Sequence, residues 1–288
     1  MNASTALRLL AAGAVALTAA CTELEIELAS DRFNAPYVQS TYTVVDQMLT
    51  LAKVGRGDVI YDLGSGDGRI PIAAAERFHV RKGVGIEMNP DLVRLSAERA
   101  KGAGVADRVS FVKGDVFKID FGEATVITMY LLPELNLGLR PRLLKLKPGT
   151  RVMSHQFDMG DWKPDATVVT DERSAPGADA MPGRNRLYLW IVPAAVEGRW
   201  RMTAGSDTIS LQLGQTFQRV AGTIDAYGNR SSIRDGRLDG DRLRFEATVR
   251  RDGRDTTLAF DGRAAGTAIA GTLTVGGRTE AVTMRRVR

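Results

Sequence analysis

The sequence predicts an α/β domain built on a parallel sheet, followed by a smaller all-β domain. Uniformly apolar strand patterns alternate with helical patterns between residues 59 and 192, as in sheets covered by helices on both faces. A turn with three glycines follows the first of these strands. After Pro193 the chain changes to short segments of alternating apolar and polar residues, separated by Gly and Asp turns.

The elements of the α/β part follow from their spacing. Apolar residues recur at helical spacing within 37–53, where Ser40 and Thr41 are candidate N-caps. Strands are then expected at 59–63, 83–87, 109–113, 124–130, 150–154 and 186–192, and helices at 70–78, 90–102 and 135–145. In such folds ligands bind at the carboxyl ends of the strands.

The all-β part reads as an antiparallel meander that forms a small barrel or sandwich. Its strands are expected at 209–213, 219–224, 242–250, 256–260, 268–275 and 280–286. The segment 197–288 carries sixteen arginines, eleven acids and no lysine, which accounts for the net charge of +5. Because these arginines alternate with acids and apolar residues and have few aromatic neighbours, we expect a solvated β surface and no nucleic-acid partner. The segment has neither His nor Cys, and its role stays open.

The N-terminus is similar to an export signal. The apolar run from Leu9 to Ala20 is too short to span a bilayer but suits a signal-peptide core. Its Ala-Ala-Cys ending resembles a bacterial lipoprotein signal, which implies lipidation of Cys21 and membrane attachment, although Thr18 stands where such signals usually have Leu. We therefore expect a signal at 1–21, a tether at 22–35, the α/β domain at 36–195 and the β domain at 196–288. The protein would be periplasmic or membrane-anchored, or cytoplasmic if the signal does not function.

The glycine turn indicates the kind of ligand. A strand ends at Asp62 and Leu63, and Gly64, Gly66 and Gly68 follow before a helix. Such a turn lets backbone approach a nucleotide-like ligand. A dinucleotide fingerprint needs a small residue where this chain has Arg69, so a nicotinamide or flavin enzyme is a poor match.

The form Asp62-x-Gly64-x-Gly66-x-Gly68 resembles motif I of the class I, seven-strand S-adenosylmethionine-dependent methyltransferases. The resemblance implies a Rossmann-like seven-strand sheet and S-adenosylmethionine as cofactor. It also implies that the acid binds the cofactor's ammonium group, that Glu87 accepts from the ribose hydroxyls and that Asp115 accepts from the adenine amino group. The cofactor-binding residues implied in this way are Tyr37, Asp62, Gly64, Ser65, Gly66, Glu87, Met88, Asp115 and Val116.

A narrower resemblance covers roughly residues 36–192. The segments 37–42, 61–70, 85–93 and 151–157 are similar to the mitochondrial lysine methyltransferases of the ATP synthase c-subunit and the adenine nucleotide translocase, with their bacterial homologues. A weaker similarity extends to the Dot1 histone-lysine methyltransferases. In such enzymes Tyr37 and its neighbours would help close the cofactor site.

The acceptor side is expected after the fourth strand. The sequence there, Met129 to Asn136, lacks the Asp/Asn-Pro-Pro-Tyr tetrapeptide, which argues against N6-adenine and glutamine substrates. Tyr130 and Asn136 are the acceptor-side catalytic candidates. His155 is either a base or a strand-end histidine bonded to backbone, and Trp162 is expected to pack in the interior.

The function predicted is SN2 methyl transfer, with a protein lysine as the favoured acceptor. A lysine must lose a proton before it attacks, and Asp67 or Glu134 could accept that proton. Two alternatives stay open: a small-molecule methyltransferase, and an exported non-catalytic binding protein that keeps the fold. Export conflicts with a cofactor made in the cytosol, but Asp62, Glu87 and Asp115 are all intact, which weighs against loss of activity. With one cysteine and two histidines, no metal site is expected.

Overall fold

A computed structural model describes residues 37–170 and 185–287, and the chain divides into two compact units. The first comprises residues up to 143 together with 153–189, and the second comprises residues 144–152 and 190–288. The predicted signal, the tether and Cys21 lie outside the described residues. None of the helices in the described ranges is long and apolar enough to cross a membrane.

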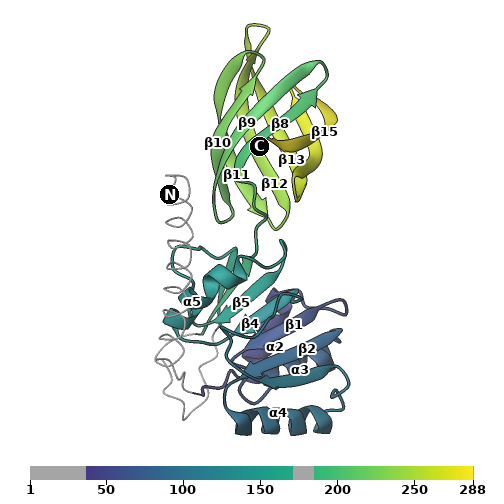
Figure 1. The fold of residues 1–288 in the computed structure, drawn as a ribbon, viewed down its shortest axis with the longest axis vertical. Helices are drawn as coiled ribbons and strands as arrows, with labels where there is room; N and C mark the ends of the chain where they lie inside the picture. The colour runs from purple at the N-terminus through teal and green to yellow at the C-terminus, as the bar shows by residue number, and fades with distance from the viewer. Residues whose placement is uncertain (1–36, 171–184, 288) are drawn as a thin grey trace, which may run out of the picture. The chain divides into compact units, whose positions relative to one another are not determined.

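The first unit is built on a seven-stranded sheet in the order β3-β2-β1-β4-β5-β7-β6 (Figure 1). Its elements, in chain order, are α2 (Tyr42–Leu51), β1 (Val59–Leu63), α3 (Arg69–Arg77), β2 (Lys82–Glu87), α4 (Pro90–Gly102), β3 (Val109–Lys113), β4 (Val126–Met129), α5 (Pro133–Leu143), β5 (Arg151–His155), β6 (Ala166–Val169) and β7 (Arg186–Ile191). Strand order reverses between β1 and β4, which pair in parallel. A ligand crevice is expected at that reversal.

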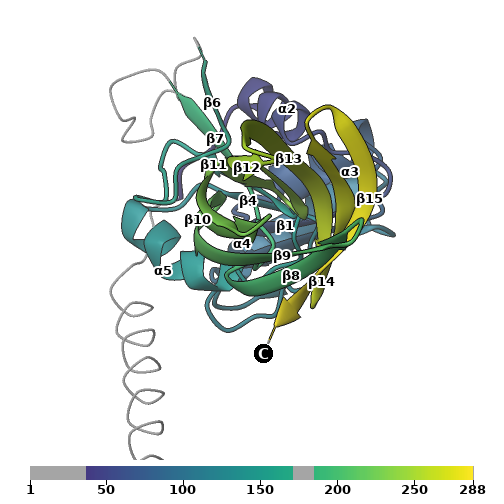
Figure 2. The same cartoon turned by 90° about the horizontal axis from the view of Figure 1, so that it is seen from above.

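The helices lie on both faces of the sheet, with α5 on the opposite side from α2 and α3 (Figure 2). Thr41 caps α2 by accepting a hydrogen bond from the Val44 N–H, and Asn89 caps α4 in the same way before Pro90. Side chains of α2 and α3 pack on β1, β4 and β5 in one apolar cluster, and β1 and β4 are buried along their whole length. Strand β1, which carries Asp62, is therefore enclosed on both faces.

One expectation for this sheet was wrong, because the sheet is mixed and not parallel. Strand β7 pairs antiparallel with β5. Two hydrogen bonds show this, one from Gln156 N to Arg186 O and one from Val192 N to Thr150 O. Strand β6, which pairs antiparallel with β7, had not been predicted. It has four residues at the edge of the sheet and none of them is buried, so it lacks the apolar run by which the other strands were found.

The second unit contains a closed antiparallel barrel of eight strands, which confirms the predicted small β domain as a barrel. Its strands are β8 (Gly198–Ala204), β9 (Asp207–Thr216), β10 (Arg219–Ala226), β11 (Asn229–Asp239), β12 (Arg242–Arg251), β13 (Arg254–Ala265), β14 (Ala268–Val275) and β15 (Arg278–Val287). Pairing of β8 with β15 and with β9 closes it.

Apolar side chains fill the interior of the barrel, among them Trp200 and the stacked rings of Phe245 and Phe260, whose centroids lie 5.2 Å apart. Strands β8 and β11 had not been predicted. In β11 a bulge between Arg234 and Arg237 interrupts the alternation of buried and exposed residues. Gly236 lies in that bulge, and a Cβ there would collide with the Val220 carbonyl oxygen.

Candidate functional site

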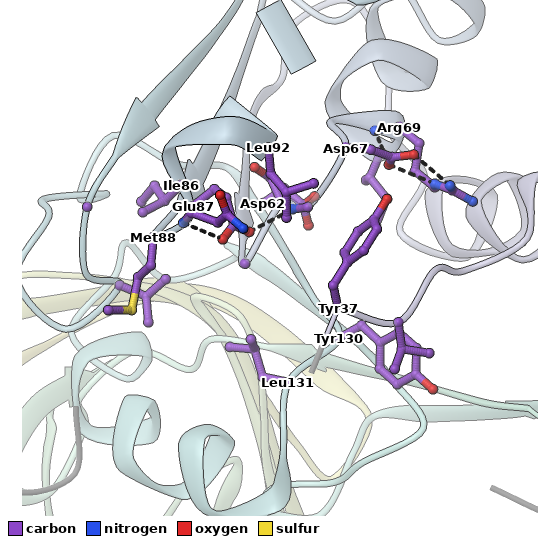
Figure 3. A pocket seen from close by; sticks show the side chains of 18 of the residues that line it. Tyr37, Asp62, Asp67, Arg69, Ile86, Glu87, Met88, Leu92, Tyr130 and Leu131 are labelled. Carbon is purple, nitrogen blue, oxygen red and sulfur yellow. Dashed lines mark hydrogen bonds and ion pairs between the residues drawn. The ribbon is translucent and has the colours of Figure 1, made fainter. Parts of the chain in front are cut away.

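A cavity of about 720 Å³ lies at the carboxyl ends of β1, β2 and β4, within the first unit (Figure 3). Five stretches line it: residues 37–40, the glycine turn, the end of β2 with the start of α4, the loop after β3 and the loop after β4. All the predicted cofactor-side residues line this cavity, namely Tyr37, Asp62, Gly64, Ser65, Gly66, Glu87, Met88, Asp115 and Val116. Of the two acceptor-side candidates, Tyr130 lines it and Asn136 does not.

The glycine turn has a backbone that only glycine adopts easily. Gly64 and Gly66 have φ of 76° and 54°. A Cβ on Gly64 would lie 2.7 Å from a Leu131 methyl carbon, and one on Gly66 would lie 2.6 Å from the Tyr37 ring. The hydroxyl of Ser65 is buried and has no hydrogen-bond partner among the described residues. The N–H groups of Gly64 and Ser65 donate to the Ile86 carbonyl oxygen, so the turn is held against the end of β2.

Asp62 is a buried acid at the end of β1, only 2% exposed. One of its oxygens accepts a hydrogen bond of 2.7 Å from the Thr128 hydroxyl on β4. Burial raises the pKa of Asp62 to about 8, and the nearby charges of Glu87 and Asp67 also raise it. Asp62 is therefore mostly protonated at pH 7, and a cationic ligand group would favour its carboxylate.

The other two acids face the cavity from neighbouring strands. The Glu87 carboxylate accepts hydrogen bonds of 2.9 Å from the N–H groups of Gly66 and Asn89. Asp115 accepts one of 2.8 Å from the Phe117 N–H. Each carboxylate has about four acceptor positions, so both retain capacity for a ligand. Met88, which is 52% exposed, gives the cavity an apolar surface beside Glu87 (Figure 3).

Residues 37–40, here called the closing segment, lie against the glycine turn. Arg69 donates to the Ser40 carbonyl oxygen at 2.6 Å and forms a two-point ion pair with Asp67. Gln39 donates to the Tyr37 hydroxyl at 2.6 Å, and Figure 3 shows that hydroxyl directed toward Asp67. Arg69, whose size excluded a dinucleotide fingerprint, thus connects the turn to the closing segment.

Neither predicted proton acceptor is well placed as a base. Burial alone would raise the pKa of Asp67, but its hydrogen bonds and ion pairs with Arg69 and Arg99 outweigh burial and lower it. Asp67 is therefore a carboxylate already engaged by two guanidinium groups. Glu134 is exposed on α5 and does not line the cavity.

A cluster of three rings follows β4 and β5, and of these rings only that of Tyr130 lines the cavity. The Tyr130 ring lies with its centroid 4.1 Å from that of His155 and 6.4 Å from that of Phe157. His155 is bonded to the side chains of Ser40 and Asn185, where a backbone partner had been one expectation. Burial lowers the pKa of His155 to about 4, so the imidazole is neutral at pH 7 and a weak base.

Asn136 holds the end of β5 and the turn that carries Phe157. Its buried amide donates to the Ser154 hydroxyl at 3.1 Å and to the carbonyl oxygen of Phe157 at 3.2 Å. The backbone from His155 to Phe157 forms a strained γ-turn, in which the Phe157 N–H donates to the His155 carbonyl oxygen. The central residue of this turn is Gln156, whose φ is 72°. Asn136 therefore braces a turn and does not face the cavity. Trp162 is fully buried, in the interior position expected for it.

Residues that sequence reasoning did not single out are Gln39, Phe157 and Asn185. Phe157 follows a strand end, a position that could have marked it. Nothing in the sequence indicates that Asn185 pairs with a histidine thirty positions earlier.

Comparison with known proteins identifies the family of the chain. The model of the ANTKMT methyltransferase domain family matches residues 62–166. A protein-lysine N-methyltransferase of Saccharolobus islandicus is 46% identical over 160 residues, which cover 55% of this chain and 94% of that protein. The chain belongs to this family of S-adenosylmethionine-dependent methyltransferases.

Two further similarities were found for the methyltransferase. The adenine nucleotide translocase lysine N-methyltransferase of Mus musculus is 35% identical over 138 residues, which cover 48% of this chain and 59% of that protein. The second is the crystal structure of an RNA methyltransferase from Salinibacter ruber in complex with S-adenosyl-L-homocysteine, whose sequence is 50% identical. The match covers 55% of this chain and 96% of that chain, with a TM-score of 0.49.

The cavity of the methyltransferase suits S-adenosylmethionine, its cofactor. The glycine turn lines the cavity without side chains at Gly64 and Gly66, and the Ser65 hydroxyl lacks a partner among the described residues. Asp62, Glu87 and Asp115 supply acceptors, as an ammonium group, a ribose diol and an adenine amino group require. When bound, the cofactor supplies an electrophilic methyl group.

Proposed function

We propose that the methyltransferase acts on lysine side chains of a protein. The observation that carries this proposal is the 46% identity to a protein-lysine N-methyltransferase over 94% of that protein's length. The mouse relatives named as lysine N-methyltransferases of the adenine nucleotide translocase and of the ATP synthase support the same acceptor class.

Within this proposal the chain's own residues mainly bind, orient and exclude water. Asp67 is engaged by arginines, and His155 has a pKa of about 4, so neither is a strong base at pH 7. The cavity wall beside Tyr130 is apolar and includes Leu131 and Leu135. Such a wall disfavours a charged lysine, lowers the pKa of its amine and so increases the fraction that is neutral and nucleophilic.

The test is transfer of radiolabelled methyl groups from S-adenosylmethionine by the full-length protein to an extract of cells that lack it. We expect label in protein, and mass spectrometry should find methylated lysine that is absent when the D62N variant is used. Label recovered only in small molecules would favour the alternative small-molecule enzyme, and label in RNA would overturn the protein acceptor. Tight cofactor binding without any transfer would favour a non-catalytic binding protein.

We also propose that the protein is exported and attached to the membrane through Cys21. This proposal rests on the sequence of residues 1–21 alone. Cell fractionation and palmitate labelling of the wild type and of C21S test it. We expect label and a membrane location for the wild type only. A cytosolic wild type without label would refute export and remove the conflict with a cytosolic cofactor.

A further inference from the structure

Three buried polar side chains form a hydrogen-bonded chain beside the cavity. The Ser40 hydroxyl lies 2.8 Å from Nδ1 of His155, and Nε2 of His155 lies 3.1 Å from Oδ1 of Asn185. The three residues are 5%, 1% and 2% exposed. They come from the closing segment, from the end of β5 and from the residue before β7, so this chain joins parts that are far apart in sequence.

The direction of these hydrogen bonds follows from their acceptors. The Asn185 oxygen can only accept, so Nε2 of His155 carries the ring proton. Since burial keeps the imidazole neutral, Nδ1 has a free lone pair and the Ser40 hydroxyl donates to it. His155 therefore acts as a fixed acceptor, oriented by Asn185, for one residue of the closing segment.

Ser40 is held from two sides. Its hydroxyl donates to His155, and its carbonyl oxygen accepts from Arg69 at 2.6 Å. Arg69 is in turn oriented by its two hydrogen bonds to Asp67 in the glycine turn. Three residues before Ser40, the Tyr37 ring packs against the turn at Gly66. The position of the closing segment over the cavity thus depends on an anchor at Ser40.

We propose that His155 is a positioning residue which, through Ser40, holds the closing segment over the cofactor cavity and so raises the affinity for S-adenosylmethionine. His155 itself is absent from the lining of the cavity. Its effect is exerted through the Ser40 hydroxyl, and the same ring supports Tyr130 on the acceptor side. This role is independent of the identity of the methyl acceptor.

A simple packing role for His155 makes the opposite prediction for two substitutions. In H155N the amide oxygen can take the position of Nδ1 and accept from Ser40, although the side chain is smaller. In H155Q the amide nitrogen can take the position of Nε2 and donate to Asn185, and the volume is better preserved, but Ser40 loses its acceptor. Packing alone favours Gln over Asn, whereas positioning of Ser40 favours Asn over Gln.

The experiment is calorimetric binding of S-adenosylhomocysteine to full-length wild type, H155N, H155Q and S40A, with thermal melting in parallel. H79N, at the exposed second histidine, is the matched control. We expect H155N to bind within about threefold of wild type and H155Q and S40A to bind about tenfold more weakly, mainly through faster dissociation. Wild-type affinity in S40A, or H155Q binding more tightly than H155N, would overturn the proposal. S40A keeps the imidazole, so it decides the matter if the His155 variants do not fold.

Discussion

Replacing Asp62 by Asn should stabilise the apo protein while weakening cofactor binding. Asp62 is fully enclosed, with the Thr128 hydroxyl as its hydrogen-bond partner, and burial raises its pKa from 3.8 to about 8. Asn can accept the same hydrogen bond and never has to ionise. The two residues therefore differ mainly in the free energy of forming a charge inside the sheet.

The magnitude follows from the linkage between pKa and stability. An acid whose pKa is raised on folding contributes most at low pH, and its contribution is lost as pH rises from the unfolded pKa of 3.8 to the folded pKa of about 8. Each unit in this range lowers the free energy of unfolding by up to about 1.4 kcal/mol. At pH 7 the loss is about 4 kcal/mol relative to a residue that does not titrate.

Urea denaturation of apo wild type and D62N, followed from about pH 4.5 to about pH 7.5, measures this difference. The transition of the methyltransferase unit is recognised by its shift on adding S-adenosylhomocysteine. We expect D62N to be more stable at pH 7, with the gap narrowing toward pH 4.5. A pH-independent gap, or a D62N protein no more stable than wild type at pH 7, would refute the reasoning.

Calorimetry tests the effect of D62N on cofactor binding. At pH 7 about nine-tenths of Asp62 is protonated, so ligand binding that requires its carboxylate should release close to one proton. Measurements in buffers of different ionisation enthalpy report that proton, and D62N should lose both the proton release and most of the affinity.

Three other substitutions test the remaining geometry. G66A should weaken binding of S-adenosylhomocysteine because its Cβ would lie 2.6 Å from the Tyr37 ring and because Ala is strained at a φ of 54°. By calorimetry, G66A should therefore lose less affinity in a Y37A background, where only the backbone strain remains, than in the wild type. E87Q should lower the affinity about tenfold by replacing an acceptor-only carboxylate, and unchanged affinity would remove Glu87 from the ribose site. N136A should lower the free energy of unfolding by about 2 kcal/mol, because the buried amide that donates to the Ser154 hydroxyl and to the Phe157 carbonyl oxygen is lost, and urea denaturation measures this.

The residues that act through local backbone could be predicted from sequence. The glycine turn, β1 and the acids at strand ends depend on patterns within ten or so residues, and the described structure places Asp62, Glu87 and Asp115 around one cavity. Asn136 was misplaced as an acceptor-side residue because the sequence does not show which face of α5 is turned toward β5. Only the fold brings its amide to the Ser154 hydroxyl.

Long-range pairs could not be predicted for a related reason. Ser40 and His155 are 115 positions apart, and neither lies in a motif that specifies a partner. Strand β6 was missed because an exposed edge strand has no apolar periodicity. In β11 the bulge shifts the alternation part-way along the strand, so a two-residue period fails although the barrel is regular.

The closed barrel has a consequence for self-modification. Every basic residue of the barrel is an arginine, because the chain has no lysine after Lys163. Arginine provides positive charge and solubility without a primary amine that could attack a sulfonium methyl group. If the acceptor is lysine, the whole barrel is chemically inert toward the active site of its own or a neighbouring copy. Closure also removes free strand edges, so a protein that binds the barrel must recognise side chains rather than extend the sheet.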